Sequence, residues 1–351
     1  MKSNILYIVM TLMLCYACAD NSATKMKSGT LLSINLELAQ PVMEVLEKTG
    51  SISLENEGDT FPGQIHKMLI DKDALYLLDT YRAPGLYKYD RNGRFLTVYN
   101  RLGQGNGEFI GLSDFQIYGD TIYLLDSSGK KIIKLDKQCR FHSSTNLSVM
   151  PLAFAKDSLD GTWLDTGNTA LSEKAYILLY EHERTMQNVL SIPFELRNMT
   201  YAPYFTLINV GNAVHFLPEM QNKIYSCENG EAVLIYYLDF GKHWFTSDFL
   251  EENKNTNSMI FFRKMKEAGY VNELNYLESE SLLLLSFNCN AESYLFVYDK
   301  DDQKQVLCVK ENDELFRPLA ISGEEILFVE MTDSCNIINK YRIKGYNDKN
   351  L

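Results

Sequence analysis

One pattern of strands and turns recurs at nearly constant spacing in this 351-residue chain, and it restricts the fold more than any other feature. Residues 74–99, ALYLLDTYRAPGLYKYDRNGRFLTVY, share one layout with residues 121–144, TIYLLDSSGKKIIKLDKQCRFHSS. Each segment contains an apolar stretch ending in Asp, a loop, an alternating stretch ending in Asp, a turn, and a third stretch led by Phe. Alternation with a period of two is typical of half-buried β-strands.

The residue that ends the alternating stretch marks the period of the repeat. Six positions align in this way: Asp90, Asp136, Glu181, Glu228, Asp299 and Arg342. Successive positions are 46, 45, 47, 71 and 43 residues apart, so the fourth interval contains an insertion. A multistranded unit repeated every 40–50 residues or so indicates a β-propeller, whose blades bury their faces against one another around an axis.

The two ends of the chain together supply one blade. Residues 51–55, SISLE, have the pattern of an outer strand, whereas the C-terminal unit ends after three strands. Pairing the two would remove both open sheet edges. We therefore predict an all-β, six-bladed β-propeller over residues 30–346, with an N-terminal strand closing the last blade. Residues 31–48 are expected to form a leading strand and a short helical turn, and residues 347–351 a tail.

The insertion, at about residues 244–270 between blades 4 and 5, breaks the β-pattern. Met259, Phe261, Phe262 and Met265 have helical spacing, with Ser258 as the expected N-cap and Gly269 as the stop. The helix is expected either to pack on the rim as local core or to serve as a lid or partner-docking element. The apolar anchors of the insertion would be Trp244, Phe245 and Phe249.

The first eighteen residues, MKSNILYIVMTLMLCYAC, have the layout of a secretory signal: Lys2, then a short apolar run, then Ala17-Cys18. A small residue directly before Cys predicts a bacterial lipoprotein signal, with Cys18 as the site of lipid attachment; the alternative is an ordinary secretory signal cut nearby. Residues 19–29 would then be a tether. This reading predicts a cell-envelope protein, an outer-membrane lipoprotein held to the membrane by its N-terminal lipid.

Composition narrows the choice of partners and cofactors. With 34 Lys and Arg against 46 Asp and Glu, the net charge of −12 argues against binding to nucleic acid. The five histidines lack zinc-site spacing, and neither a GxSxG elbow nor a calcium loop is present, so we predict no catalytic residue, metal ligand or cofactor. The cysteines do not form a disulfide framework, although one bridge between Cys289 and Cys308 is possible.

Two segments carry a resemblance to a known family. Residues 61–68, FPGQIHKM, and residues 102–109, LGQGNGEF, together with the paired strands ending in Asp, resemble the NHL-related six-bladed β-propeller lipoproteins of gut Bacteroidota. The resemblance covers nearly all of the mature chain and departs at Asn106, where the family usually has Pro. It implies a fold and an envelope location, and it brings no defined catalytic residues.

The glycine-rich segment at residues 101–111, RLGQGNGEFIG, has two possible roles. A phosphate-binding loop needs a helix directly after the glycines, but a strand pattern follows, so a connection between blades is favoured. The apolar strand that ends in Asp, such as residues 74–79, is taken as the first of its blade. This connection is then predicted to share one channel mouth with the turn at residues 90–93, while the loops at residues 80–85 and 126–131 line the other mouth. Arg91, Arg101, Gln104 and Glu108 are then the candidate ligand-binding residues.

Together these features favour a lipid-anchored binding or scaffold protein, expected to be monomeric, whose unknown protein or glycan ligand contacts the loop-bearing mouth of the channel. The alternative is a propeller enzyme, such as a calcium-assisted lyase, lactonase or hydrolase, with carboxylates converging on the channel; calcium belongs to this alternative alone. A third possibility is a structural envelope component whose blades serve as docking surface.

Overall fold

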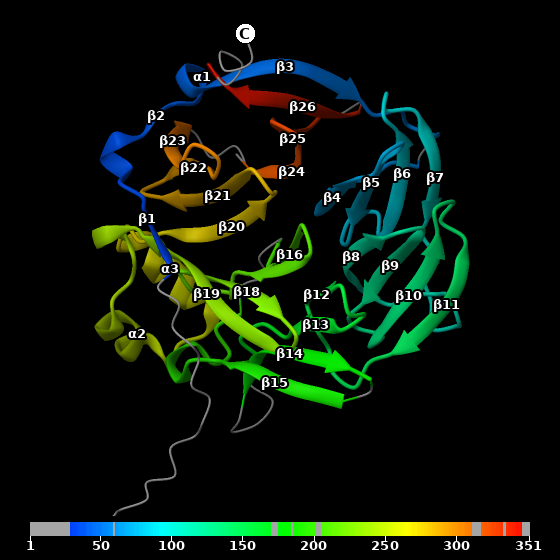
Figure 1. Ribbon diagram of the computed structural model, residues 1–351, viewed down its shortest axis with the longest axis horizontal. Helices are drawn as coiled ribbons and strands as arrows, with labels where there is room; N and C mark the ends of the chain where they lie inside the picture. The colour runs from blue at the N-terminus through cyan, green and yellow to red at the C-terminus, as the bar shows by residue number, and fades with distance from the viewer. Residues whose placement is uncertain are drawn as a thin grey trace, which may run out of the picture.

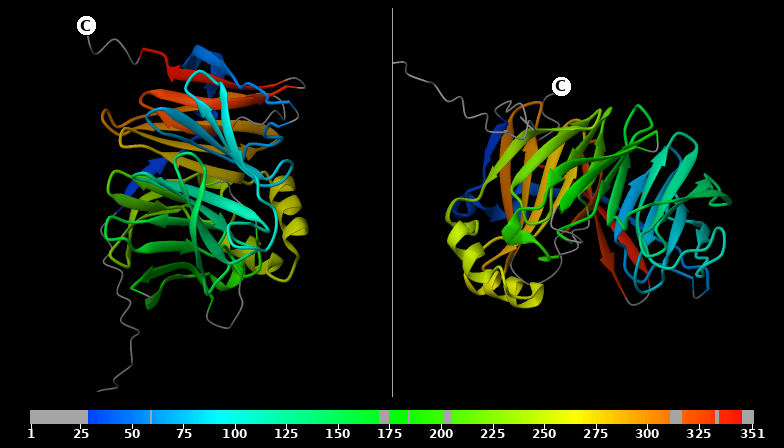
Figure 2. Two further views of the ribbon diagram at one scale, coloured as in Figure 1. Left: turned by 90° about the vertical axis from the view of Figure 1, so that its right-hand side faces the viewer. Right: turned by 90° about the horizontal axis from the view of Figure 1, so that it is seen from below.

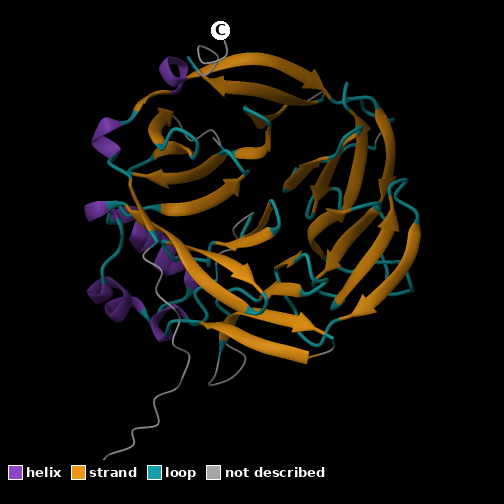
Figure 3. Ribbon diagram, viewed as in Figure 1, coloured by secondary structure: helices purple, strands orange, loops and turns teal. Residues whose placement is uncertain are grey.

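The computed structural model describes residues 29–58, 60–169, 175–183, 185–200, 205–310, 317–332 and 335–345. Six sheets, each built on four antiparallel strands, surround a central axis, as Figures 1 and 3 show. This confirms the predicted six-bladed β-propeller. The signal at residues 1–18, the lipid-attachment residue Cys18, most of the tether and the C-terminal tail lie outside the described residues.

The strands of each blade are given in order from the axis outward, and the first strand of a blade is the one nearest the axis. Blade 1 contains β4 (Lys67–Ile70), β5 (Ala74–Asp79), β6 (Gly85–Asp90) and β7 (Phe95–Tyr99). Blade 2 contains β8 (Leu112–Tyr118), β9 (Thr121–Asp126), β10 (Lys131–Asp136) and β11 (Phe141–Asn146). Blade 3 contains β12 (Ala153–Lys156), β13 (Thr162–Asp165), β14 (Tyr176–His182) and β15 (Thr185–Ser191).

The second half of the ring follows the same order. Blade 4 contains β16 (Leu207–Val210), β17 (Ala213–Phe216), β18 (Lys223–Glu228) and β19 (Glu231–Asp239). Blade 5 contains β20 (Asn272–Glu278), β21 (Leu282–Cys289), β22 (Glu292–Asp299) and β23 (Lys304–Lys310). Blade 6 contains β24 (Pro318–Ser322), β25 (Glu325–Met331), β26 (Asn336–Ile343) and the N-terminal strand β3 (Leu46–Ser53).

Strand β3 closes the ring as predicted, and it begins five residues earlier than the predicted outer strand. It pairs antiparallel with β26, and Ile52 lies opposite Ile338 while Leu46 lies opposite Ile343. Leu46 is fully buried between blades 5 and 6. The edge strand of the last blade is therefore supplied from the other end of the chain.

The segment before β3 runs along the outside of two further blades (Figure 1). Strand β1 (Thr30–Ser33) pairs in parallel with β19 of blade 4, and β2 (Gln40–Pro41) pairs in parallel with β23 of blade 5. The 3-10 turn η1 (Leu36–Leu38) and the short helix α1 (Val42–Val45) connect them. The predicted leading strand and helical turn are thus confirmed, and they extend the sheets of blades 4 and 5.

The core lies between neighbouring blades. Strand β5 is buried along its whole length because both its faces pack on other blades, whereas most residues of the outer strand β7 are partly or fully exposed. Tyr76 and Leu78 of β5, for example, share one apolar cluster with Phe115 of β8 and Ile133 of β10. Each blade therefore depends on its neighbours for burial.

The predicted helical insertion is present, at one face of the ring (Figure 2). It consists of the 3-10 turn η3 (Gly241–His243), helix α2 (Ser247–Asn253) and helix α3 (Ser258–Glu267). The N-cap of α3 is Asn257 rather than the predicted Ser258, because the Asn257 carboxamide accepts a hydrogen bond from the Ile260 N–H at 2.9 Å. We call this side the insertion face and the other side the opposite face.

We expect Leu46→Ala to lower the free energy of unfolding by about 2–4 kcal/mol, because it opens a cavity at the closure of the ring. Leu38→Ala, on the same N-terminal segment but 71% exposed, is the control and should change stability by about 0.5 kcal/mol or less. Urea unfolding of both variants measures the difference. Equal losses would show that β3 does not hold the ring closed.

Candidate functional site

The four predicted ligand-binding residues do not meet at the channel. Arg91 lies in the turn between β6 and β7, which packs at the outer rim against the end of β3: Gly93 O accepts from Glu55 N at 2.8 Å. Arg101, Gln104 and Glu108 lie in the connection between blades 1 and 2, and none of the four residues lines either cavity of the channel. The prediction that they share one channel mouth is therefore wrong. Whether any of them contacts a ligand at the rim stays a prediction.

The glycine-rich segment at residues 101–111 is a connection between blades 1 and 2. The Glu108 carboxylate accepts from Gly105 N at 2.7 Å, and Lys131 Nζ of blade 2 donates to Gly105 O at 3.3 Å. Gly107 has φ +78°, and a Cβ there would lie 2.8 Å from the Phe141 ring. The glycines permit this backbone conformation and close approach, and the strand β8 follows them, as the sequence predicts.

The loops between second and third strands lie beside the connections that enter each blade, and not on the other face as predicted. The Asp79 carboxylate ends β5 and accepts from Gly63 N and Gln64 N at 2.7 and 2.8 Å. It also accepts from three N–H groups of the loop after β5, those of Tyr81, Arg82 and Ala83. One buried carboxylate thus ties both loops together on the insertion face.

Asp126 does the same in blade 2, accepting from Ile110 N, Gly111 N and Gly129 N at 2.9–3.1 Å. Asp165 holds this position in blade 3, but its surroundings differ. Ala153 lies opposite Asp165 as Leu112 lies opposite Asp126.

The two residues before Ala153 are Pro151 and Leu152. Pro151 has no N–H, and Leu152 N donates to the main-chain oxygen of Asp165 at 2.7 Å. The Asp165 carboxylate still accepts a hydrogen bond from the Gly167 N–H at 2.8 Å, and it lines the channel mouth.

The channel contains two cavities of about 320 Å³ each. The cavity at the insertion face is lined by the beginnings of the first strands of blades 1 to 4 and by Thr80, Asp165 and Glu219. The cavity at the opposite face is lined mainly by the ends of first strands, from blades 1, 2, 4, 5 and 6. Lys67, Phe205 and Leu207 line both cavities and therefore stand where the two meet.

A buried ion pair holds this junction. Lys67 Nζ lies 2.7 Å from Asp114 Oδ1, and both residues are about 5% exposed or less. Asp114 also accepts from Phe154 N of blade 3 at 3.0 Å, so it links three blades. Lys67 Nζ lies 5.8 Å from the Phe115 ring centroid and 5.9 Å from that of Phe205, within reach of cation–π attraction.

Two carboxyl groups of the insertion-face cavity have strongly altered acidity. Burial raises the pKa of Asp165 to about 6; Thr206 and the Gly167 N–H oppose this shift, and the charge of Asp114 adds to it. Burial also raises the pKa of Glu219 to about 9, opposed by the Asn168 N–H and reinforced by the charge of Asp165. At neutral pH the mouth therefore presents one protonated carboxyl and one that is mostly ionised.

At the opposite face, Glu278 is held by neighbouring side chains. It is contacted by His215 Nδ1 at 2.7 Å, by Lys300 Nζ at 2.5 Å and by the Tyr276 hydroxyl. Because His215 comes from blade 4 and the other groups from blade 5, this cluster joins two blades.

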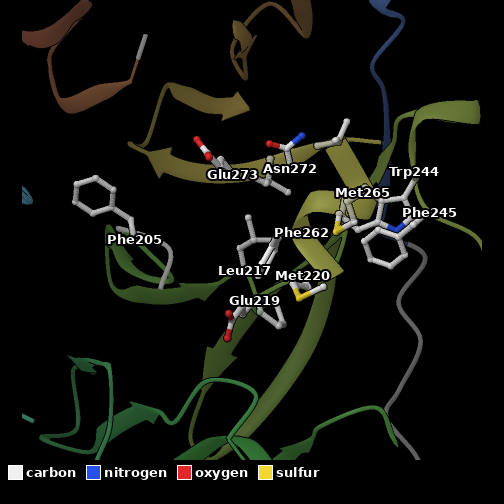
Figure 4. Close-up of a pocket in the computed structure, with 13 residues that line it drawn as sticks. Phe205, Leu217, Glu219, Met220, Trp244, Phe245, Phe262, Met265, Asn272 and Glu273 are labelled. Carbon is white, nitrogen blue, oxygen red and sulfur yellow. The ribbon is translucent and has the colours of Figure 1, made fainter. Parts of the chain in front are cut away.

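A narrow apolar pocket lies beside the insertion-face cavity, beneath α3 (Figure 4). Its walls come from α3, from Trp244 and Phe245, from the loop after β17 and from the start of β20. Phe205 and Glu219 line both this pocket and the insertion-face cavity, so the two spaces adjoin.

The described residues contain no group of three or more His, Cys, Asp or Glu side chains placed to hold a metal ion. No helix among them has the length and apolar character to cross a membrane. Cys289 and Cys308 are free and buried, so the possible bridge between them is absent; Cys289 Sγ instead donates to Gly269 O at 3.2 Å.

The sequence over residues 34–330 matches the model of a family described as 6-bladed beta-propeller (DUF5128). The chain belongs to this family. Among solved structures, an exported protein from Bacteroides fragilis is 16% identical, with a TM-score of 0.76 over 90% of this chain and 100% of that chain. A member of the DUF4221 family from Bacteroides vulgatus is 8% identical, with a TM-score of 0.59 over 85% and 98% of the two chains. At this identity the likeness shows the fold alone. A comparison with curated proteins finds no match.

Asp79 and Asp165 occupy the same repeat position, and their substitution by Asn should have opposite effects. Asp79→Asn weakens five N–H interactions, so we expect a loss of about 1–3 kcal/mol at neutral pH. Asp165 is costly to ionise in the fold because its pKa is raised, so wild-type stability falls as pH rises through about 6. Asp165→Asn removes that fall, and its stability relative to wild type should rise by about 1–3 kcal/mol from pH 4 to pH 8.

Urea unfolding of both variants and of wild type at pH 4, 6 and 8 tests this contrast. A pH-independent difference between Asp165→Asn and wild type would contradict the raised pKa of Asp165.

Proposed function

We propose that this protein is a lipid-anchored propeller of the bacterial cell envelope that binds a ligand or partner at the insertion-face mouth of its channel. The family and the exported Bacteroides relative support the propeller and export from the cytoplasm. The lipid anchor rests on Ala17-Cys18 in the sequence. The observation that carries the binding site is the pair Asp165 and Glu219, buried at 1% and 3% exposure yet lining a cavity of about 320 Å³.

Rigid strands and short loops place these two groups, so little order must be gained when a ligand binds. A protonated and an ionised carboxyl side by side offer both a hydrogen-bond donor and strong acceptors. Such a mouth favours ligands rich in hydrogen-bonding groups, among them glycans and peptide segments.

The same pair supports a second candidate, a hydrolase or lyase. Neighbouring carboxyls with pKa values near 6 and 9 form a possible acid–base couple, with Glu219 as the acid and Asp165 as the base. If this candidate is right, Glu219→Gln retains binding of the ligand but abolishes its conversion, which mass spectrometry of the incubated ligand detects.

The anchor is tested at Cys18. Cys18→Ala removes the thiol that would carry the lipid, so the protein should leave the membrane fraction and lose incorporation of labelled palmitate. Cys15→Ala, three residues earlier in the same signal, is the control and should retain both. Continued labelling of Cys18→Ala would show that Cys18 is not the lipidated residue.

The ligand site is tested by a thermal-shift screen of the purified protein against glycans and peptides, since a ligand that binds the folded ring raises its melting temperature. For any hit, Asp165→Asn should weaken affinity by about tenfold or more, the effect of losing one charged hydrogen bond. Arg91→Ala, at the rim between blades 6 and 1, should leave affinity unchanged. Arg101→Ala separates the rim from the mouth: a loss there without a loss in Asp165→Asn would place the ligand on the glycine-rich connection and overturn the proposal.

A further inference from the structure

An apolar pocket lies beneath α3, next to the proposed binding site. Leu217 and Met220 of blade 4 form one wall, and Phe262 and Met265 of α3 form another (Figure 4). Trp244 closes the outer end of the pocket and Phe205 the end toward the channel (Figure 4). Its enclosed free volume is about 30 Å³, so a ring that enters must displace a side chain. Met220 is only partly buried, and its unbranched thioether makes it suited to such a move.

Carboxyl groups stand where this pocket opens. Glu219 lies on the border between the pocket and the channel cavity, with Asp165 close enough for its charge to raise the Glu219 pKa. Glu273 lies on the other side of the opening, and its carboxylate accepts from Asn288 Nδ2 at 2.8 Å. The opening of an apolar pocket is therefore flanked by acidic groups from blades 3, 4 and 5.

The backbone at Glu273 is unusual for its position. Strand β20 changes register between Asn272 and Asn275, and Glu273 within this bulge has φ +53°. A non-glycine residue rarely adopts this conformation, and bulges of this kind re-aim side chains beside binding sites. Here the bulge sets Glu273 at the pocket opening, because the pocket is lined by Asn272, Glu273 and Leu274 in succession.

Within the part of the chain that the structure describes, Lys67 and Arg317 near the mouth have partners of their own. Lys67 is paired with Asp114 at 2.7 Å, and Arg317 donates to Ile65 O at 3.3 Å. His66 lines the cavity, but burial and the charge of Arg317 lower its pKa, so it is neutral at pH 7. The groups that act on the Asp165 pKa are Thr206, Gly167 and Asp114, none of which is a cation.

We propose that the pocket beneath α3 and the adjoining channel mouth form one site for an organic cation that carries an aromatic group. The aromatic group enters between Met220, Phe262 and Trp244, and the ammonium or guanidinium group lies against Glu219 and Asp165. This inference rests on the proposed function and names the ligand chemistry of that site. Aromatic walls favour an apolar ring, and they also attract a cation that has left water. The cation in turn favours the ionised form of Glu219, so binding releases a proton when it occurs below the Glu219 pKa of about 9.

The test uses calorimetric titration of the purified protein with three probes of similar size: 4-phenylbutylamine, 4-phenylbutanol and 4-phenylbutyrate. We expect the amine to bind with a Kd of about 1 mM, ordinary for a fragment of this size, and about tenfold more tightly than the alcohol. The acid should bind more weakly still. Titration at pH 7.5 in two buffers of different ionisation enthalpy should show proton release with the amine and none with the alcohol.

Three variants locate the binding. Glu219→Gln should weaken binding of the amine by about fivefold or more and abolish proton release, and it should leave the affinity for the alcohol unchanged. Phe262→Ala should weaken the amine and the alcohol alike. Glu280→Gln, an exposed residue just after β20 at its opposite-face end, should change nothing. Circular dichroism and unfolding of each variant show that the ring is intact before its affinities are compared.

A second pair of probes distinguishes a free amine from a peptide source, because the capped dipeptides Ac-Phe-Lys-NH2 and Ac-Phe-Glu-NH2 carry the same groups. Tighter binding of the lysine dipeptide than of 4-phenylbutylamine assigns the site to a peptide, and the reverse order assigns it to small amines. Equal affinity for amine, alcohol and acid, or no binding of the amine, overturns the inference. If the inference fails in this way but Asp165→Asn still weakens binding of a ligand found by the screen, the proposed function stands without the inference. If Arg91→Ala instead weakens binding of the amine, the inference and the proposed function both fail.

Discussion

The pairing of β3 with β26 is the interaction on which the rest of the structure depends. It joins residues about 290 positions apart in sequence, from Ile337 opposite Ser53 to Ile343 opposite Leu46. Without it, blade 6 would expose the edge of β26, and the faces that bury Leu46 and Ile338 would lose their cover. Because each blade buries its faces only against its neighbours, an opening at one boundary weakens the ring as a whole. The channel and its mouth exist only in the closed ring.

Most of the fold could be predicted from the sequence because the repeat is carried by hydrophobic alternation and turn residues. The blade count and the place of the insertion follow from the spacing of positions such as Asp90 and Asp136, and the closing strand follows from a C-terminal unit that ends after three strands. The positions of the loops could not be predicted so well. First strands such as β4, with four residues, are short and have little pattern of their own. If the longer strand that ends in Asp, such as β5, is counted as the first strand of its blade, the loops are assigned to the wrong face of the ring. This error explains why the predicted residues do not share one channel mouth.

The candidate site itself was almost invisible in the sequence. Asp165 belongs to the same recurring position as Asp79 and Asp126, where the carboxylate ties two loops together by accepting several N–H groups. Its different environment in blade 3 comes from Pro151, which cannot donate. In blades 1 and 2 the connection before the first strand donates N–H groups to the Asp carboxylate. A proline in the equivalent connection of blade 3 is the sequence signal that would have singled out Asp165. Glu219 has no such signal, because its pKa depends on how the loop after β17 buries it beside blade 3.

The buried pair of Lys67 and Asp114 gives the two ends of the channel different chemistry. Removing one partner of such a pair typically costs about 3–5 kcal/mol, so the junction does not open readily to let a ligand through. Under the proposed function, a ligand therefore approaches from one face and ends at Lys67 and Phe205. On the opposite face it meets Glu278, already held by His215, Tyr276 and Lys300. On the insertion face it meets Asp165 and Glu219, whose pKa values are raised chiefly by burial, which disfavours their ionised forms. Under the proposed function, a cationic group favours the ionised forms of these two carboxyls and therefore gains most at the insertion face. This difference in electrostatic free energy makes the two mouths of one ring unequal as proposed binding sites.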